Sequence, residues 1–554
     1  MAADNPINSS SSSIDPISGF CSETGIYHSL RPAVPLPPLT APLSVTEYVF
    51  QLLDRIIPSS SSPHQALIDS TTRRSIPYPE LVRRSNALAN FIQQRIGLRR
   101  GDVALILSSN SVYVPILYLS LFSCGVIVSP SNPINSKSEI SYQIQLCKPA
   151  IAFASSDSAF KVPPLPLGTL LLDTLEFDSM MTGETDASSF RPLLKISQSD
   201  TAAILYSSGT TGRVKGVELT HRNFISVLDG MYNSRASRNS PAVNMIAVPY
   251  FHVYGFVQCL RAVAFGETLV TAGGRFDLRK MVMAIKEFKV THLATVPAIL
   301  VALTKKVDDV SSFDMRSLEV VTCGGAPVPG SVIEMFKAQF PSVQVSQGYG
   351  LTESTAGVIR AVGAEESGRL GSSGKLMPFF EAKIVDPETG TNNRRGELWL
   401  RGPSIMKGYV GDVEATAVAL DSDGWLRTGD LCYFDSEGFL YVTDRLKELI
   451  KYKGYQVAPA ELENVLQSHP DILDAAVIPY PDEEAGQIPM AFVVKRPGRC
   501  VLETDVKNFI SRQVAPYKKV RRVQFIAQLP KNASGKVLRR ELIKLALSVT
   551  SSKL

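Results

Sequence analysis

The stretch "YSSGTTGRVKGV", residues 206–217, brings hydroxyl side chains, three glycines and two basic residues into twelve positions. A glycine-rich turn directs successive backbone N–H groups and hydroxyls at one anion, and a nearby lysine adds positive charge. The apolar run "TAAILY" before it has strand character, and apolar residues at helical spacing follow Thr220. This order of strand, loop and helix is typical of a phosphate site. The stretch is therefore either a phosphate-binding loop or a solvated surface turn.

The loop differs from the P-loop of ordinary NTPases, in which the lysine is followed by a serine or threonine that binds Mg²⁺. Here Arg213 follows Gly212, and Gly216 follows Lys215. The sequence therefore disfavours a mechanical or signalling P-loop NTPase.

Composition narrows the class of protein. The 554 residues are enough for about three or four domains of roughly 150 residues each, and 44% hydrophobic with 20% charged residues is typical of a globular protein. The net charge of +5 is small for this length and no long Lys/Arg block occurs, so no nucleic acid partner is expected. The seven cysteines never form a C-x-x-C pair, which predicts neither a zinc site nor a disulfide framework and favours a reducing compartment.

The chain ends and one apolar stretch bear on localisation. The serine-rich opening, residues 1–13, lacks the apolar core of a signal peptide, so we expect a loose tail and no export. Residues 113–128 approach the length of a membrane span, but Pro115 and Gly125 interrupt them, which predicts a buried helix, then a buried strand, and no transmembrane segment. The final residues Ser552, Lys553 and Leu554 spell the peroxisomal address, which predicts a peroxisomal location and an import receptor as partner.

Short apolar runs of strand length alternate with helical patterns over most of the chain. Examples are "VALILSS", "AAILYSS" and "LEVVTCGG" for strands, and residues 329–340 for a helix. This alternation predicts an α/β fold with mainly parallel sheets, whose ligands gather at the carboxyl ends of strands. After about residue 380 the pattern changes to paired strands and turns, and a small closing domain is expected to begin near Lys447.

Further motifs follow the loop in order: "QGYGLTES", then "GWLRTGD" and "DRLKELIKYKGYQVAP", then "PKNASGK". Together they resemble the adenylate-forming (ANL) superfamily of acyl-CoA synthetases, firefly luciferases and peptide-synthetase adenylation domains, over roughly residues 45–545. The stretches "YFHVYGF" and "GGAPV" are similar to plant 4-coumarate:CoA ligases and their peroxisomal relatives.

The resemblance implies an α/β architecture with a large N-terminal region, made of two α/β layers plus a small β subdomain, and a small mobile α+β lid at the C-terminus. The implied divisions are a flexible tail and entry segment at residues 1–40, an adenylation domain at residues 41–446, a lid at residues 447–549 and a targeting tail at residues 550–554. The implied chemistry has two half-reactions. A carboxylate attacks the α-phosphate of MgATP to give an acyl-adenylate and pyrophosphate, and the thiol of coenzyme A then displaces AMP.

The resemblance also implies roles for individual residues. ATP or AMP would be bound by Ser207, Ser208, Gly209, Thr210, Thr211, Lys215, Ala326, Gln347, Gly348, Thr352, Asp430, Arg445 and Lys447. Glu353 would support Mg²⁺, a hard cation that prefers oxygen ligands. The acyl pocket would be lined by Tyr254, Thr322, Ala356 and Gly357, with His252 as a gate at its mouth. Coenzyme A would be bound by Arg275, Lys453 and Gly454.

The resemblance implies that lysines promote the two half-reactions. Attack on ATP develops negative charge around the α-phosphate, which a preorganised cation stabilises, and Lys536 in "ASGK" matches the adenylation lysine of the family. For the second step the lid would rotate and exchange Lys536 for Lys451 and Gln456. Each residue also has an ordinary interpretation outside the motifs: a surface lysine, a turn aspartate such as Asp430, or a core histidine such as His252.

The departures from 4-coumarate:CoA ligases fall in the acyl pocket, so they bear on the substrate. Thr322 stands where those ligases have a lysine that faces the ring hydroxyl, and Ala356 and Gly357 replace a Pro-Val pair, which removes volume. The candidate substrates are hydroxycinnamates such as 4-coumarate, cinnamate, medium and long fatty acids, and the cyclopentanone acids of jasmonate synthesis. We expect 4-coumarate, whose thioester would link phenylpropanoid metabolism to peroxisomal β-oxidation and to benzenoid precursors such as those of the ubiquinone ring.

A different class of function also fits the nucleotide motifs, namely a non-catalytic nucleotide-binding scaffold. It is disfavoured because every implied catalytic position holds a residue of the expected type. Release of pyrophosphate distinguishes the alternatives, since a ligase releases it, a phosphate-yielding NTPase does not, and a scaffold releases neither product.

Overall fold

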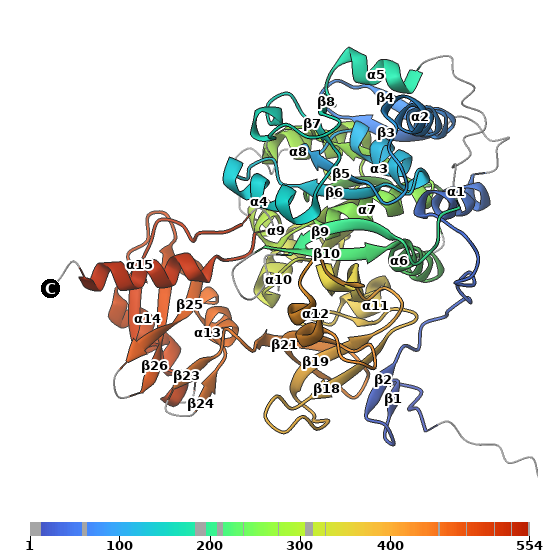
Figure 1. The fold of residues 1–554 in the computed structure, drawn as a ribbon. Helices are drawn as coiled ribbons and strands as arrows, with labels where there is room; N and C mark the ends of the chain where they lie inside the picture. The colour runs from blue at the N-terminus through green and yellow to red at the C-terminus, as the bar shows by residue number, and fades with distance from the viewer. Residues whose placement is uncertain are drawn as a thin grey trace, which may run out of the picture.

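The computed structural model describes residues 13–57, 64–182, 195–207, 214–235, 238–274, 276–304, 314–326, 328–452, 455–482, 485–514, 516–532 and 535–551. A large N-terminal domain and a smaller C-terminal domain lie side by side, and an extended segment joins them (Figure 1). Strands and helices alternate along most of the large domain, so the predicted α/β class is confirmed.

One α/β layer of the large domain is built on a mainly parallel sheet. Its strand order among the described residues is β17-β16-β15-β14-β13-β11-β12-β3-β4, and its two edges are antiparallel. The bounds are β3 (Gln65–Asp69), β4 (Ser75–Pro77), β11 (Val243–Ile246), β12 (Thr268–Thr271), β13 (His292–Thr295), β14 (Val320–Cys323), β15 (Gln344–Leu351), β16 (Ala356–Arg360) and β17 (Lys375–Leu376).

The second layer has the strand order β20-β10-β9-β6-β5-β7-β8 within the described part of the chain. Its bounds are β5 (Val103–Leu107), β6 (Ile127–Ser131), β7 (Ile151–Ala154), β8 (Thr169–Leu171), β9 (Thr201–Ser207), β10 (Lys215–Thr220) and β20 (Gly408–Tyr409). Helix α3 (Tyr113–Ser123) is buried and leads into the buried strand β6, as the sequence predicts for this apolar stretch. In the described residues, no helix is long and apolar enough to cross a membrane.

A layer of helices joins these two sheets into one hydrophobic core. Helix α7 (Val253–Ala264) lies on β11 and β12 of the first sheet, α3 lies on β6 of the second, and α1 packs against both helices. The other helices of the large domain are α1 (Val45–Ile56), α2 (Tyr78–Phe91), α4 (Lys137–Cys147), α5 (Leu175–Thr182), α6 (His221–Asn233), α8 (Leu278–Phe288), α9 (Pro297–Thr304), α10 (Gly330–Gln339), α11 (Gly363–Ser367) and α12 (Val413–Ala419).

A separate β sheet completes the large domain. Its described strands run in the order β1-β2-β18-β19-β21-β22, with bounds β1 (Phe20–Cys21), β2 (Ile26–His28), β18 (Glu381–Val385), β19 (Gly396–Arg401), β21 (Leu426–Phe434) and β22 (Leu440–Arg445). The sequence predicts a flexible tail and entry segment up to residue 40, but β1 and β2 form a hairpin inside it. This hairpin is anchored because β2 pairs with β18.

The C-terminal domain is α+β. Its described strands are β23 (Ile450–Tyr452), β24 (Tyr455–Val457), β25 (Ile472–Asp482), β26 (Gly486–Lys495) and β27 (Arg522–Phe525), and its helices are α13 (Pro459–Gln467), α14 (Glu503–Ser511) and α15 (Arg539–Ser551). Hydrophobic clusters separate from that of the large domain lie on its sheet. The predicted boundary between residues 446 and 447 falls between β22, which ends at Arg445, and β23, which begins at Ile450.

The structure corrects the predicted order of strand, loop and helix around residues 206–217. Strand β9 precedes the loop as predicted, but the loop returns into β10, which pairs antiparallel with β9. Helix α6 begins only afterwards, where Thr220 caps its N-terminus in a capping box with Asn223. The alternating apolar residues Val217 and Leu219 explain the extra strand, because both are buried. Residues 208–213 lie outside the described residues, and the described segment that follows them is β10, which is not a helix.

Candidate functional site

The two ends of the predicted phosphate loop lie opposite each other. Ser207, the last residue of β9, is the cross-strand partner of Lys215, the first residue of β10. The predicted ligands Ser208, Gly209, Thr210 and Thr211 lie outside the described residues. The ammonium group of Lys215 lies over the ring of Tyr409, 4.5 Å from its centre, which is a cation–π contact.

The "GYGLTES" motif lies beside this hairpin. Thr352 and Glu353 form a short 3₁₀ turn after β15, and this turn packs against β9 and β10. The Tyr409 hydroxyl donates to the Glu353 carboxylate over 3.0 Å, so one tyrosine contacts both Lys215 and Glu353. Burial and the Glu353 charge raise the pKa of Tyr409, which keeps the hydroxyl a donor. Sequence reasoning did not identify Tyr409, because its ring acquires this role only through the fold.

A buried carboxylate lies near the end of the large domain. Asp430 of β21 is 2% exposed and faces Arg445 of β22 in register, with 3.1 Å between the Arg445 Nε and the Asp430 Oδ1. The Tyr349 hydroxyl donates to the other carboxylate oxygen over 2.6 Å. Burial raises the pKa of Asp430, while Arg445 and Tyr349 act in the opposite direction. The structure therefore places two predicted nucleotide-binding residues, Asp430 and Arg445, in contact, and Tyr349 of the "QGYG" motif, which received no role from the sequence, contacts the same carboxylate.

The turn that carries Lys536 is fixed by its own hydrogen bonds. The backbone N–H of Lys536 donates to the Asn532 side chain, and the backbone N–H of Asn532 donates to the Lys536 carbonyl, both over 2.9 Å. Gly535 has a φ of 80°, in the left-handed region that favours glycine. A Cβ atom at Gly535 would lie 3.7 Å from Val296 and Ala298 of the large domain. The lid turn therefore lies directly against the large domain.

This placement brings Lys536 into the electrostatic environment of the Asp430 and Arg445 pair. Burial and the Arg445 charge lower the pKa of Lys536 to about 8, whereas Glu448 and Asp430 oppose the shift. Reciprocally, Lys536 lowers the pKa of Asp430, although burial outweighs it. An ammonium group from the small domain thus shares the site with residues of the large domain.

Lys447, in the segment between β22 and β23 that joins the two domains, is a further cation near the predicted phosphate loop. Burial and the charge of Lys215 lower the pKa of Lys447, so these two lysines lie close to each other although they are far apart in sequence. By contrast, Lys451 of β23 is exposed, and its backbone N–H donates to the Gln487 side chain within the small domain. Gln456 lies opposite Lys451 in β24. The structure therefore groups Lys447 and Lys536 with the predicted nucleotide-binding residues and does not bring Lys451 there.

The predicted acyl pocket centres on Tyr254. Its hydroxyl donates to the Thr322 carbonyl over 2.9 Å, and its ring lies 3.6 Å from the position that a Cβ atom would take at Gly324. His252 caps the N-terminus of α7 by accepting the Tyr254 backbone N–H over 3.3 Å, and burial lowers its pKa. His252 is thus held at the N-terminus of α7 as a neutral imidazole near neutral pH.

The remaining predicted lining residues, Ala356 and Gly357, begin β16. A Cβ atom at Gly357 would meet nothing within 4 Å, so open space adjoins this residue. Ala356 is buried and has a φ of 78°, which a proline cannot adopt, so a Pro-Val pair would not fit this backbone. Ala326 follows β14, whereas Gln347 and Gly348 lie in the middle of β15, and all three are partly exposed. Arg275, Lys453 and Gly454 lie outside the described residues.

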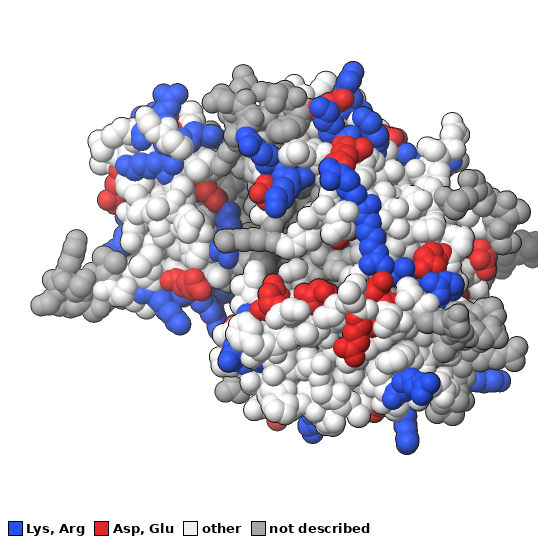
Figure 2. All heavy atoms as spheres, turned by 90° about the horizontal axis from the view of Figure 1, so that it is seen from above, with Lys and Arg blue, Asp and Glu red and all other residues white. Residues whose placement is uncertain are grey.

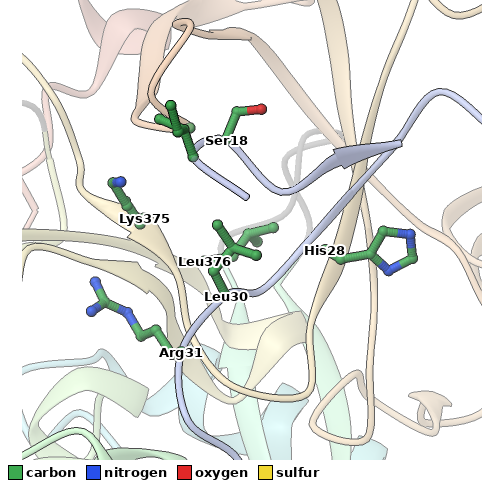
Figure 3. A pocket seen from close by; sticks show the side chains of 8 residues that line it. Ser18, His28, Leu30, Arg31, Lys375 and Leu376 are labelled. Atoms are coloured by element: carbon green, nitrogen blue, oxygen red, sulfur yellow. The ribbon is translucent and has the colours of Figure 1, made fainter. Parts of the chain in front are cut away.

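Figure 3 shows a different, small cavity of about 30 Å³. It lies between the N-terminal hairpin and β17, and its lining includes Ser18, His28, Arg31 and Lys375. None of the predicted site residues lines it, so it is separate from the candidate site. On the face seen in Figure 2, acidic and basic side chains lie next to one another over both domains.

The chain matches two protein-family models. The model of the AMP-binding enzyme family matches residues 59–410, and that of the AMP-binding enzyme C-terminal domain matches residues 461–536. The chain belongs to the AMP-binding enzyme family. It is an AMP-forming acid–CoA ligase of the 4-coumarate:CoA ligase-like group, for which ATP and coenzyme A are co-substrates.

Two relatives from Arabidopsis thaliana match nearly the whole ligase. "4-coumarate--CoA ligase-like 9" is 49% identical, with 98% of each chain covered, and "Peroxisomal OPC-8:0-CoA ligase 1" is 43% identical, with 97% of this chain and 99% of the relative covered. Among solved structures, ATP-bound MatB from Rhodopseudomonas palustris has a TM-score of 0.80 at 25% identity, covering 91% of this chain and 99% of that one. The o-succinylbenzoate CoA synthetase of Bacillus subtilis, solved with its acyl-adenylate, has a TM-score of 0.75 at 27% identity, covering 89% and 97%.

Proposed function

We propose that this ligase activates 4-coumarate or a related hydroxycinnamate, first as the acyl-adenylate and then as the CoA thioester. The observation that carries the proposal is the wall formed by Tyr254. Its ring is anchored through Thr322 and lies 3.6 Å from the Cβ position at Gly324, where no side chain intervenes. A planar aromatic acid gains stacking contacts against such a fixed ring.

Longer acids are the second candidate, and a specific observation favours them. Open space adjoins Gly357, and Thr322 has a shorter side chain than the lysine found there in 4-coumarate:CoA ligases. A fatty acid or a jasmonate-precursor acid would use this space. The relative named as a peroxisomal OPC-8:0-CoA ligase supports that alternative.

The proposal assigns the first half-reaction to residues that the structure groups together. Lys215 and the loop before it would hold the β- and γ-phosphates, Asp430 would accept the ribose hydroxyls, and Thr352 would contact the α-phosphate. Lys536 would stabilise the charge that develops when the substrate carboxylate attacks. These roles fit the contacts of Lys215 with Tyr409 and of Asp430 with Arg445.

Magnesium fits the same arrangement through one carboxylate. Mg²⁺ is usually bound in nucleotide enzymes by one or two carboxylates together with substrate phosphates. Glu353 is partly exposed, and one of its carboxylate oxygens accepts from Tyr409. When bound, the ion would neutralise phosphate charge, and Glu353 would hold it beside the hairpin that carries the phosphate loop.

The second half-reaction would require the lid to turn. In this structure Lys536 lies at the site and Lys451 is exposed, which fits the adenylate-forming arrangement. Rotation about the segment near Lys447 would exchange them, and Lys453, Gly454 and Arg275 would then bind coenzyme A.

The location belongs to the same proposal. Ser552, Lys553 and Leu554 form the peroxisomal address, although they lie outside the described residues. The thioester formed in a peroxisome would enter β-oxidative chain shortening. A hydroxycinnamoyl thioester would yield a benzenoid acid of the kind that supplies quinone rings.

The proposal is tested by incubating purified enzyme with MgATP, coenzyme A and a panel of hydroxycinnamates, fatty acids and cyclopentanone acids. Thioester is detected by mass, and pyrophosphate release is measured alongside. We expect 4-coumarate to give the highest kcat/KM. A preference for the longer acids would establish the second candidate, and nucleotide binding with no pyrophosphate release for any acid would contradict both.

A further inference from the structure

A charged cluster lies at the end of α7 opposite the predicted pocket mouth. The Arg261 Nη2 contacts both carboxylate oxygens of Glu267, over 2.9 and 2.7 Å. The Asn244 amide donates to the same carboxylate over 2.7 Å. Arg261, Glu267 and Asn244 are all buried, and Arg360 acts electrostatically on Glu267 from β16. Charged groups at such depth are uncommon unless they are paired or functional.

One face of α7 connects this cluster with the pocket. Tyr254, Gln258 and Arg261 recur at helical spacing, so they lie along one face. Every other residue of this fully described helix is buried, whereas Tyr254 and Gln258 are partly exposed. Solvent-accessible space therefore adjoins α7 along the line from Tyr254 towards Arg261.

The sheet beneath presents Arg360 to the same region. Gly348 of β15 and Arg360 of β16 are cross-strand partners, so their side chains share one sheet face. A Cβ atom at Gly348 would lie 3.9 Å from the Arg360 Cγ, which confirms this direction. The carbonyl of Gly348 lies beside the Cβ position of Gly324, where the Tyr254 ring packs. Arg360 thus extends from the lining of the predicted acyl pocket.

The guanidinium of Arg360 has no hydrogen-bond partner among the described residues, and its Nε is buried and unsatisfied. The contact between Arg360 and Arg31 uses the Arg360 carbonyl oxygen, which accepts from the Arg31 side chain. The carboxylate of Glu267 is already engaged by Arg261 and Asn244. The described cluster therefore contains two arginines for one carboxylate.

The electrostatic environment of Arg360 is consistent with a cation that lacks a charged partner. Burial and the charge of Arg261 lower the pKa of Arg360 to about 10, which still leaves the group cationic at neutral pH. Burial also lowers the pKa of the neighbouring His292 to about 3, so His292 is neutral there. Arg360 is partly exposed as a residue, but its buried Nε has no partner among the described residues, and leaving a buried N–H unpaired is costly.

We propose that Arg360 is a specificity-determining residue whose guanidinium donates hydrogen bonds to an oxygen at the far end of the acyl substrate. The inference rests on the proposed function of the pocket and names the substrate class more narrowly. The ligand is an acid with a distal hydrogen-bond acceptor, either the ring hydroxyl oxygen of a hydroxycinnamate or the carbonyl oxygen of a longer oxo acid. Arg360 would then supply a polar group to the distal end of the pocket, where Thr322 is too short to provide one.

The test compares acids that differ only in the distal oxygen. One pair is 4-coumarate and cinnamate, and the other is a medium-chain ω-oxo acid and the fatty acid of equal length. The specificity ratio is kcat/KM for the oxygenated acid divided by kcat/KM for its partner. Arg360→Met removes the guanidinium but keeps an unbranched side chain, and Arg369→Met is the matched control, because Arg369 pairs with Glu437 on the surface.

In the wild-type enzyme we expect the ratio to favour the oxygenated acid in at least one pair, and that pair identifies the source of the oxygen. Arg360→Met should lower this ratio by about 10- to 150-fold, the range typical of hydrogen bonds to a charged group. Turnover of the unsubstituted acid should not fall, and the melting temperature should not decrease, because Glu267 keeps its partners Arg261 and Asn244. Arg369→Met should leave the ratio unchanged.

Other outcomes overturn the inference in distinguishable ways. An unchanged ratio in Arg360→Met, with thioester still formed, would refute the role of Arg360 and leave the ligase function standing. Equal losses for both acids of a pair, with a lower melting temperature, would show a structural role. If Arg360→Met does not fold, Arg360→Lys keeps the cation without the planar fork and should give a smaller drop in the same ratio. Failure of the wild-type enzyme to form any thioester would instead refute the proposed function.

Discussion

Replacing Lys536 with alanine should slow adenylate formation by about 100- to 1,000-fold, the usual cost of removing one preorganised contact to developing charge. The same change should leave thiolysis of a supplied acyl-adenylate nearly unchanged. The reason is geometric, since Lys536 is the lid residue whose ammonium lies in the field of Asp430 and Arg445, whereas Lys451 is exposed.

The lowered pKa of Lys536 adds a second, independent signature. With a pKa of about 8, the cation is largely present at pH 7 and falls to roughly a tenth of the molecules at pH 9. The stabilising charge is therefore present below the pKa and lost above it. Because kcat/KM reports groups of the free enzyme, its value for adenylation should fall about tenfold per pH unit above pH 8. In Lys536→Ala that fall should disappear.

The two half-reactions are measured separately. Pyrophosphate release in a single turnover reports the first, and thioester formation from supplied acyl-adenylate and coenzyme A reports the second. Lys531→Ala is the matched control, because Lys531 lies on the same turn, bridged to Val537, but pairs with Asp474 over 2.6 Å. Equal losses in both half-reactions, or an equal loss in the control, would refute the division of labour between the faces of the lid.

Four further predictions concern the pocket, the lid and the address. Gly357→Val should lower turnover of a long fatty acid relative to 4-coumarate by roughly 5- to 150-fold, since overpacking a fitted pocket costs about 1–3 kcal/mol. If ATP binding is intact and the ratio of the two turnover rates stays within twofold of wild type, the pocket assignment is wrong. Ala356→Pro should instead impair folding and so lower turnover of every acid, because φ at Ala356 is 78°. Thermal melting of the two variants should therefore show a lower melting temperature for Ala356→Pro. Burial raises the pKa of Glu463 to about 7 despite its ion pair with Arg539, so its contribution to stability is present at low pH and lost as pH rises from about 4.3 to about 7. The fall in melting temperature across that window should therefore be smaller in Glu463→Gln, and an identical slope would contradict the burial argument. Deleting residues 552–554 should move a fluorescent fusion from punctate peroxisomes to the cytosol, and an unchanged pattern would exclude this address.

Local sequence was sufficient for features that depend on neighbouring residues. The helix after Thr220 and the buried helix followed by a strand from residue 113 to residue 128 were predictable because hydrophobic periodicity acts within a few positions. The motifs also identified the enzyme class, since their order and spacing are specific. Strand β10 was missed because its short alternation at Val217 and Leu219 merges with the helical pattern that follows.

At the predicted acyl pocket, the local sequence did not predict the backbone conformation. The sequence revealed that Ala356 and Gly357 are small, but not that Ala356 has a left-handed backbone while Gly357 faces open space. Backbone dihedrals at such a turn are imposed by the strands on both sides, β15 and β16. A substitution that looks equivalent in sequence therefore has different physical consequences at the two positions.

By itself, the sequence determined the family and the α/β class, because these follow from motifs and short-range periodicity, whereas its nucleotide-binding residues stay predictions. Only the tertiary structure decided that Tyr349 and Tyr409 contact Asp430 and Glu353, and that Arg360 lies unpaired near Arg261. Tyr349 and Asp430 are 81 positions apart in the sequence, and Arg261 and Arg360 are 99 positions apart. Side chains so distant in sequence meet only when sheets and helices pack, and the charge of a buried group depends on neighbours that no local pattern contains.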